Sequence, residues 1–230
     1  DKLDDVFKKV NTPYSLFCAD DDFILIDAIT KCVSFLKANK SYSSAQGNYV
    51  FYNYSQKQFF YTPAYTGAIG ADLNDESPSK RISTYNKTPI QLYYCVHRTE
   101  TLKYVFSNAS KKIKNLNLVE LLIGYCSVIF GKHKVLPIFY SQRELLYDSA
   151  GKSDRIDVIS TSVKYKQEYG SFIKIVDNLL SKHESNTKVN MVNDAIKELI
   201  IHRLSNQFTS KAETVGKLAK IIIPLWLRKS

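Results

Sequence analysis

The first third of the chain alternates between strand-like apolar runs and helix-like apolar periodicity. Residues 14–19 form a short apolar run that ends at three aspartates, which predicts a buried strand followed by a polar turn. Over residues 26–36, isoleucine, valine and leucine recur at helical spacing, which predicts a helix. Aromatic and β-branched residues over 42–62 predict one or two strands, interrupted at 46–48.

The middle of the chain carries its longest polar stretch. Residues 66–88 are rich in glycine, aspartate, asparagine, serine and proline, which predicts a long loop of the kind that often has a function. The apolar pattern then predicts a strand over 90–96 and a short helix around 102–106. A longer helix is predicted from 115 to a natural stop at Gly131.

The last strand signal lies at residues 135–140, where Pro137 indicates a sheet edge or a strand end. Beyond about residue 150 strand signals fade, and two helices are predicted, over 173–180 and 192–204. The chain therefore divides into an α/β region over residues 1–148 and a helical region over residues 149–230.

The C-terminal segment 211–230 places apolar residues on one helical stripe and lysines on the other faces, with Trp226 close to the end. This pattern is typical of an interfacial helix that binds an anionic lipid surface. It is also typical of a terminal helix whose apolar stripe packs on the domain. No segment reaches the roughly 20 apolar residues that a membrane span needs.

Composition narrows the class of protein. With 44% hydrophobic residues, the 230-residue chain can fill a core, which excludes disorder as its main state. The 32 Lys and Arg against 22 Asp and Glu give a net charge of +10, which favours an anionic partner. The four cysteines contain no C-x-x-C pair, and each lies in an apolar neighbourhood typical of buried free thiols: Cys18, Cys32, Cys95 and Cys126. We expect a cytoplasmic location, since the acidic start lacks signal-peptide features, with peripheral association at the inner membrane face as an option.

The three consecutive aspartates at 20–22 are the strongest chemical signal. In an extended segment, residues two apart point to the same side, so Asp20 and Asp22 can address one ligand. Two carboxylates suit a hard divalent cation, Mg²⁺ or Mn²⁺, that keeps open positions for substrate phosphate. The alternative is a solvated acidic turn whose last aspartate caps the following helix.

The run 14–23 resembles the D-x-D segment of family 2-type glycosyltransferases with the GT-A fold, of the bacterial polysaccharide-building type. The resemblance covers about residues 12–145 and continues, in the expected order, through residues 44–47, 94–99, 119–122, 131–132 and 136–140. Family members begin with a strand–loop–helix half that holds the nucleotide base. Only residues 1–19 precede the turn here, so the resemblance implies that this N-terminal half is missing.

The resemblance implies a GT-A-like mixed sheet flanked by helices, followed by a C-terminal helical region. It also implies a metal-dependent, inverting, hexosyltransferase-like enzyme. The donor would be a nucleotide-diphosphate sugar and the acceptor a hydroxyl of a saccharide or lipid-linked molecule, in cell-surface polysaccharide or glycolipid synthesis. In that scheme Asp22 ligates Mn²⁺ or Mg²⁺, Asp20 contacts the ribose or the metal's waters, and Asp21 points into the fold. Glu120 is implied as the general base, and Arg143 as a contact to the diphosphate.

Each of these residues also has a structural interpretation. Glu120 fits a first-turn glutamate favoured by the helix dipole, and Arg143 fits a surface ion pair. His97 and Arg98 lie at a strand end on the acceptor side, where such residues more often pack or face solvent. We expect His133 in a solvated turn, and the histidines lack the partners of a zinc site.

Two other classes of function stay open. The net charge of +10, with 16 tyrosines and 12 phenylalanines, is compatible with nucleic-acid binding. The basic residues are dispersed and no RNP-like, C₂H₂ or KH pattern occurs, so we expect no nucleic acid as partner. The remaining alternative is a non-catalytic scaffold at the membrane face.

Overall fold

The computed structural model describes residues 2–55, 58–63, 72–87, 91–144, 156–185 and 191–201. Within these ranges six strands form one mixed sheet in the order β1-β5-β3-β6-β2, and β4 pairs with β3. The strands are β1 (Tyr14–Ser15), β2 (Phe23–Ile24), β3 (Tyr42–Ser55), β4 (Gln58–Pro63), β5 (Val96–Arg98) and β6 (Lys132–Glu144).

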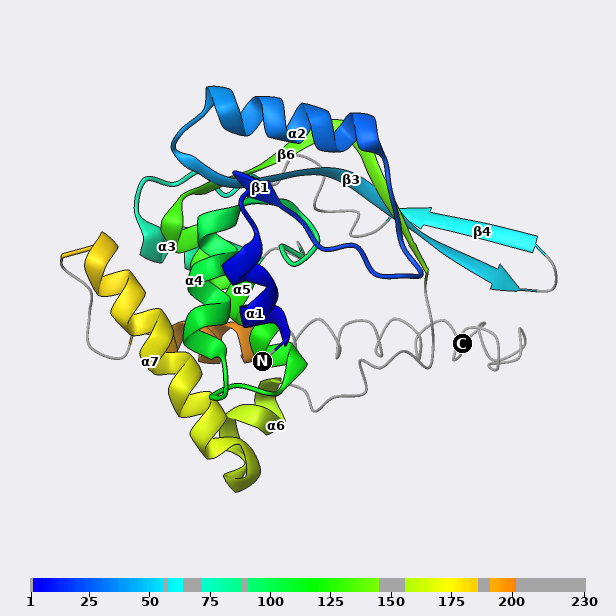
Figure 1. Ribbon diagram of the computed structural model, residues 1–230. Coiled ribbons are helices and arrows are strands. Elements are labelled where there is room, and N and C mark those ends of the chain that lie inside the picture. The colour runs from blue at the N-terminus through cyan, green and yellow to red at the C-terminus, as the bar shows by residue number, and fades with distance from the viewer. Residues whose placement is uncertain are drawn as a thin grey trace, which may run out of the picture.

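Helices lie on both faces of this sheet, so the α/β class predicted from the sequence is confirmed (Figure 1). They are α1 (Lys2–Lys9), α2 (Ile26–Ala38), α3 (Pro78–Lys87), α4 (Thr99–Ala109), α5 (Leu116–Phe130), α6 (Ile156–Thr161) and α7 (Lys166–His183). A 3₁₀ turn spans Val163–Tyr165, and residues 191–201 are also helical.

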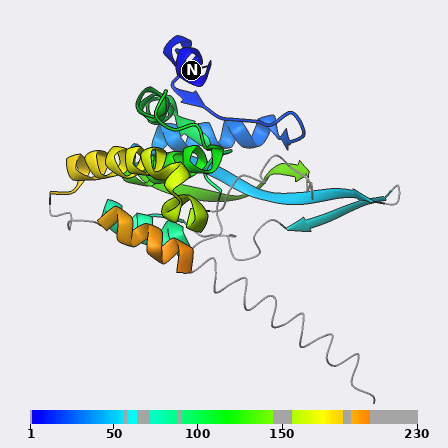
Figure 2. The ribbon, with the colours of Figure 1, turned by 90° about the horizontal axis from the view of Figure 1, so that it is seen from below.

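The strand directions give the sheet a defined carboxyl end. β3 and β6 are parallel, while β5 is antiparallel to both of its neighbours, β3 and β1. Strands β1, β3 and β6 therefore run the same way, and we call the end toward which they run the carboxyl end of the sheet. The β3–β4 hairpin extends beyond the helices (Figures 1 and 2).

Two apolar clusters hold the layers together. Helix α2 covers one face of the sheet through Ala28, Cys32 and Leu36, which pack with Tyr140 of β6. The opposite face is covered by α5, whose residues 121–129 are all buried because neighbouring helices enclose it. Helix α7 and residues 191–201 add their apolar stripes to this second cluster, so the core runs across the composition boundary at residue 148.

The periodic helices predicted from the sequence are confirmed. Residues 26–36 lie in α2, 102–106 in α4, and 173–180 in α7. The predicted helix at 115–131 is α5, where the Asn115 side chain accepts a hydrogen bond from the backbone N–H of Leu118 and Gly131 is the C-cap residue. The helix predicted over 192–204 is confirmed through residue 201. Residues 202–230, with the amphipathic segment 211–230, lie outside the described residues.

The prediction of a loop over residues 66–88 is wrong for its second part, which forms α3. The sequence of α3 is polar, but its first turn is held by a residue far along the chain. The Glu184 carboxylate accepts hydrogen bonds from the backbone N–H of Ser79 at 3.1 Å and from the hydroxyl of Ser77 at 2.7 Å. A carboxylate at this end satisfies the unpaired N–H groups that a helix start leaves.

Two predicted strands are shorter than expected. The strand predicted over 14–19 covers only β1, and the strand predicted over 90–96 begins only at Val96. The residues before Val96 form a turn, closed by a hydrogen bond from Cys95 N–H to the Leu92 carbonyl at 3.4 Å. In both segments, the remaining apolar residues belong to turns and connections and do not pair with a neighbouring strand.

The interruption expected at 46–48 is a register shift within one continuous strand. β3 passes through Gly47, and its pairing with β6 slips between Gln46 and Asn48. A Cβ on Gly47 would lie 2.5 Å from the Ile138 carbonyl oxygen, so the close approach of the two strands requires glycine. Pro137 lies opposite this irregularity, beyond the reach of β2, which pairs only with residues 141 and 142.

Candidate functional site

The aspartate turn lies at the carboxyl end of the sheet, beside the end of β6. The chain leaves β1 in that direction, turns with Asp22 N–H bonded to the Ala19 carbonyl at 3.2 Å, and pairs β2 with β6. Helix α2 then begins at Ile26 after Leu25, and no side chain caps it. The alternative that Asp22 caps this helix is therefore wrong.

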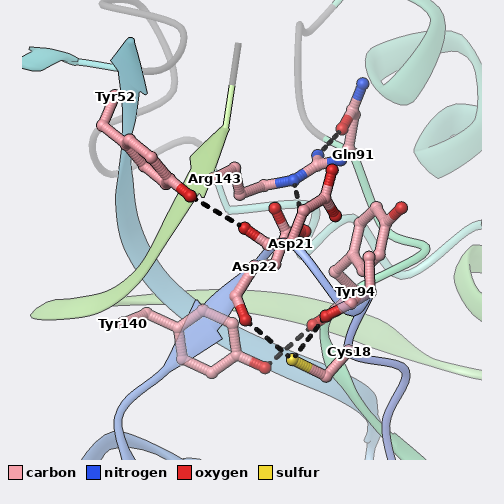
Figure 3. A network of polar contacts seen from close by, with 9 residues as sticks. Cys18, Asp21, Asp22, Tyr52, Gln91, Tyr94, Tyr140 and Arg143 are labelled. Carbon is pink, nitrogen blue, oxygen red and sulfur yellow. Dashed lines mark hydrogen bonds and ion pairs between the residues drawn. The ribbon is translucent and has the colours of Figure 1, made fainter. Parts of the chain in front are cut away.

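Asp22 and Arg143 form an ion pair that links the turn to the end of β6 (Figure 3). The Arg143 Nε donates to Asp22 Oδ2 at 2.9 Å, and the side chains are only 18% and 5% exposed, respectively. Arg143 therefore forms an ion pair, as its structural interpretation predicts, but the pair is largely buried rather than on the surface. A pair so withdrawn from water interacts more strongly than an exposed pair.

Two further residues hold the guanidinium of Arg143. Its Cζ lies 4.0 Å from the ring centroid of Tyr94, and its Nη1 donates to the side-chain oxygen of Gln91. Burial acts to lower the pKa of Arg143, but the interactions with Asp22, Tyr94 and Tyr49 together outweigh it, so the pKa lies above its ordinary value. The guanidinium stays charged.

Tyr94 is the point at which the predicted site residues meet. Burial raises the pKa of its phenol; the Arg143 charge acts to lower it, and Glu120, Asp22 and Asp21 act to raise it. Helix α5 leads into β6 through the single residue Gly131 and so runs back along the sheet, which carries Glu120 toward the carboxyl end. The structure thus brings Asp21, Asp22, Glu120 and Arg143 within electrostatic reach of one tyrosine.

Glu120 differs from its predicted setting in one respect. It is the fifth residue of α5, which starts at Leu116, and the first turn of α5 holds no acidic residue. The expectation of a glutamate at the helix start, stabilised by the helix dipole, is therefore wrong. Glu120 is exposed.

Two other side chains bind the backbone of the turn, and a third binds the backbone of Tyr94 (Figure 3). The Tyr52 hydroxyl on β3 donates to the Asp21 carbonyl oxygen at 3.1 Å, and the Tyr140 hydroxyl donates to the Tyr94 carbonyl oxygen at 2.8 Å. The Cys18 thiol points to the carbonyl of Asp22 at 3.5 Å. Sequence reasoning did not assign Tyr52, Gln91 or Tyr94 to the site. For Tyr94 a signal was available in the sequence: it is an aromatic residue just before β5, a strand that borders the site.

Asp20 and Asp21 lie in a turn, so the expectation that an extended backbone points Asp20 and Asp22 to the same side is wrong. Asp20 is exposed in the turn, and Asp22 already binds a positive charge in the form of Arg143. No cluster of three or more His, Cys, Asp or Glu arranged for a metal occurs in the part of the chain that the structure describes. Mg²⁺ is commonly held by one or two carboxylates together with water and substrate phosphates. Of the carboxylates at this turn, that of Asp20 is exposed, whereas Asp22 could ligate such an ion only in place of Arg143.

The predicted acceptor-side residues His97 and Arg98 are packing residues. His97 is fully buried, with Nε2 bonded to the Leu92 carbonyl at 2.8 Å and Nδ1 3.1 Å from the Ser127 hydroxyl. The guanidinium of Arg98 donates to three backbone carbonyls, those of Leu36, Asn39 and Tyr42. Neither side chain lies at the aspartate turn.

The expectation that His133 lies in a solvated turn is wrong. It is on β6 with no exposed surface, and its Nδ1 lies 2.9 Å from the Ser44 hydroxyl. Burial lowers the pKa of His133 to about 3 and that of His97 to about 4. Both imidazoles are neutral at physiological pH and stabilise the core rather than a site.

The cysteines follow their prediction with one exception. Cys32, Cys95 and Cys126 are buried free thiols, whereas Cys18 is exposed beside the aspartate turn.

Within the described ranges, every helix is too short or too polar to cross a bilayer. No protein-family model matches the chain, and no curated protein matches it significantly.

Proposed function

We propose that the protein transfers a sugar from a nucleotide-diphosphate donor to a hydroxyl of a saccharide or lipid-linked acceptor. The observation that carries this proposal is the convergence of Asp22, Glu120 and Arg143, from three distant segments, around Tyr94 at the carboxyl end of the sheet. Open α/β sheets bind their ligands at this end. Its groups match the needs of the reaction: carboxylates for a cation, a guanidinium for phosphate and an exposed carboxylate for a proton.

Asp22 and Asp20 are the residues that would hold Mg²⁺ or Mn²⁺ at the turn. A bound divalent ion would supply positive charge to the diphosphate leaving group. Arg143 adds a second positive charge from the end of β6, and its planar fork suits a phosphate oxygen pair. Tyr94 and Gln91 fix the orientation of that fork.

Glu120 is the proposed general base. It is exposed and close enough to Tyr94 for its charge to act on the phenol, so it lies on the same end of the sheet as the phosphate-binding groups. A carboxylate at that position accepts the proton of the acceptor hydroxyl as it attacks the anomeric carbon. A lipid-linked acceptor would bring the protein to the inner face of the membrane.

The proposal is tested by calorimetric titration of the full chain with UDP, GDP and their common sugar conjugates, each with Mn²⁺ or with EDTA. We expect Mn²⁺-dependent binding of one nucleotide, lost in Asp22→Asn and retained in the control Asp27→Asn, which alters an exposed aspartate on α2. A folded protein that binds no nucleotide under any of these conditions would support the scaffold alternative and refute the proposal.

A further inference from the structure

The start of α5 and the start of α7 meet on the side of the molecule opposite α2 (Figure 1). The Glu168 carboxylate, in the first turn of α7, accepts hydrogen bonds from the backbone N–H groups of Lys114 and Asn115, at 2.7 and 2.8 Å. The Asn115 side chain accepts another from the backbone N–H of Leu118. These N–H groups are therefore satisfied within the protein, and they fix the loop before α5 beside the beginning of α7.

Two aliphatic side chains project into solvent at this junction. Leu116, the first residue of α5, is 61% exposed, and Val163, in the 3₁₀ turn before α7, is 87% exposed. Their apolar neighbours Ile113 and Tyr165 are buried in the core. Covering Leu116 and Val163 with an apolar partner would gain free energy, because it removes apolar surface from water.

Exposed lysines flank both side chains in the sequence. Three lie in the loop before α5 and two adjoin Val163: Lys111, Lys112, Lys114, Lys164 and Lys166. The carboxylates of the same segments are those of Glu120, Asp157 and Glu168, and that of Glu168 is occupied by backbone N–H groups. Five lysines against three carboxylates give the junction a positive charge, which attracts an anionic partner.

Aliphatic side chains ringed by lysines fit an anionic bilayer better than other anionic partners. The aliphatic groups enter the hydrocarbon boundary while the lysines meet acidic headgroups. A nucleic acid would instead stack its bases on exposed aromatic rings. The ring in this turn, that of Tyr165, is buried, and Lys164 Nζ lies 4.6 Å from its centroid. A free phosphate would gain nothing from Leu116 or Val163.

A second group of exposed apolar residues has the opposite charge setting. Phe23, Leu25 and Ile26, at the start of α2, are 58%, 46% and 79% exposed. The aspartate turn precedes them and Asp27 follows. Acidic headgroups would be repelled there, so only the junction of α5 and α7 combines exposed aliphatic groups with the charge that an anionic bilayer requires.

We propose that Leu116, Val163 and the five lysines around them form a docking surface for an anionic lipid bilayer. Docking would bring Glu120 close to the bilayer, because this exposed residue lies four positions beyond Leu116, about 6 Å along α5. A lipid-linked acceptor would then reach the proposed base without leaving the membrane. That consequence rests on the proposed function, whereas the docking surface itself does not.

The test is co-sedimentation of the full chain, without nucleotide, with vesicles of phosphatidylcholine alone or mixed with phosphatidylserine. We expect binding only to vesicles that contain phosphatidylserine, weakened by added salt. Leu116→Ser and Val163→Ser should each weaken this binding by about fivefold or more, because each removes an apolar group from the lipid contact. Replacing Lys111 and Lys112 by glutamine should weaken it by about fivefold for each lysine.

The controls alter the same kinds of residue on α2. Ile26→Ser changes an exposed aliphatic residue that is the first of its helix, as Leu116 is, and Lys31→Gln with Lys37→Gln removes two exposed lysines. None of these changes should alter vesicle binding. Equal losses in the controls, or no binding to anionic vesicles by the wild-type protein, would overturn the proposal.

Two further outcomes would also overturn the docking surface. Wild-type affinity in the Leu116, Val163 and lysine variants would assign lipid binding to another part of the chain, such as residues 211–230. Binding of a single-stranded oligonucleotide in place of vesicles, weakened by the lysine changes but not by Leu116→Ser, would assign the surface to nucleic acid. If vesicles bind as expected but no nucleotide or nucleotide sugar does, the docking surface stands and the proposed function fails.

Discussion

The guanidinium of Arg143 lies over the ring of Tyr94, with its Cζ 4.0 Å from the ring centroid. The two residues come from different parts of the sheet: Arg143 from the end of β6, and Tyr94 from the turn before β5. The guanidinium therefore contacts both the ring and the carboxylate of Asp22 (Figure 3). The positive charge of the site is therefore fixed in position by an aromatic ring as well as by a carboxylate.

Replacing the Tyr94 ring should measure this contact. We expect Tyr94→Leu to lower the free energy of unfolding by about 0.5–2 kcal/mol through the lost cation–π contact, in addition to the lost apolar burial. Tyr94→Phe keeps the ring and should cost less. A double-mutant cycle with Arg143→Met, read by urea denaturation, isolates the pair. A coupling energy near zero would contradict the contact.

The general-base assignment predicts a separation between binding and turnover. Glu120→Gln keeps the shape of the side chain but removes its ability to accept a proton, so turnover should fall by roughly 10²–10⁴ while donor affinity is retained. The matched control is Glu100→Gln, which alters an exposed glutamate in the first turn of α4. Steady-state kinetics combined with calorimetry decide the matter. Weakened donor binding with normal turnover at saturation would rule out Glu120 as the base.

The two buried histidines predict a loss of stability in mild acid. Burial holds the pKa of His97 at about 4 and that of His133 at about 3, below the ordinary value of 6.5. As the pH falls below about 6.5 the unfolded chain takes up protons that the folded protein refuses, so each histidine removes roughly 1.4 kcal/mol of stability per pH unit. This contribution is fully present above pH 6.5 and is lost progressively toward the folded-state values.

Histidine NMR shifts followed from pH 7.5 to 5.0 provide the check, together with urea denaturation over the same range. The imidazole signals of His97 and His133 should stay those of neutral rings down to pH 5. Titration of either ring near pH 6.5 in the folded protein would show that it is accessible to water, contrary to its burial.

Two glycines should respond to alanine in opposite directions. Gly47→Ala places a Cβ 2.5 Å from the Ile138 carbonyl oxygen, so β3 and β6 must separate, at a cost of roughly 1–3 kcal/mol. Gly170 lies inside α7, and nothing lies within 4 Å of its added Cβ, so Gly170→Ala should stabilise the fold by about 0.5–1 kcal/mol. Thermal and urea denaturation of both variants suffice. Equal effects would contradict the close strand approach at Gly47.

The elements that the sequence predicts well are those whose stability is local. Helices α2, α4 and α5 carry an apolar stripe at helical spacing, and Asn115 marks the start of α5 with a side-chain cap. Helix α3 was missed because its sequence is polar and its start is held by Glu184, which is 105 residues beyond Ser79. The extents of β1 and β5 depend on which residues of neighbouring strands face them, a property that composition does not reveal.

The candidate site likewise has a part that the sequence predicts and a part that it does not. The aspartate turn could be found because three consecutive carboxylates directly follow an apolar run, and the resemblance to family 2-type glycosyltransferases pointed to Glu120 and Arg143. The pairing of Asp22 with Arg143 could not be found, because the two residues are 121 positions apart and meet only when β2 pairs with β6. The contact between Gln91 and Arg143 could not be found either, because these two residues are also far apart in the sequence.

The proposed cation and nucleotide site is tested most directly by paramagnetic broadening in protein labelled at its tyrosine rings. With Mn²⁺ and UDP or GDP, the ring signals of Tyr94 should broaden at the lowest Mn²⁺ concentration. Those of Tyr125, buried among the helices, should stay sharp, and EDTA should reverse the effect. The same titration of Asp22→Asn should leave Tyr94 sharp. Broadening that is uniform over the tyrosines, or that is unchanged in Asp22→Asn, would contradict a cation and nucleotide site at the aspartate turn.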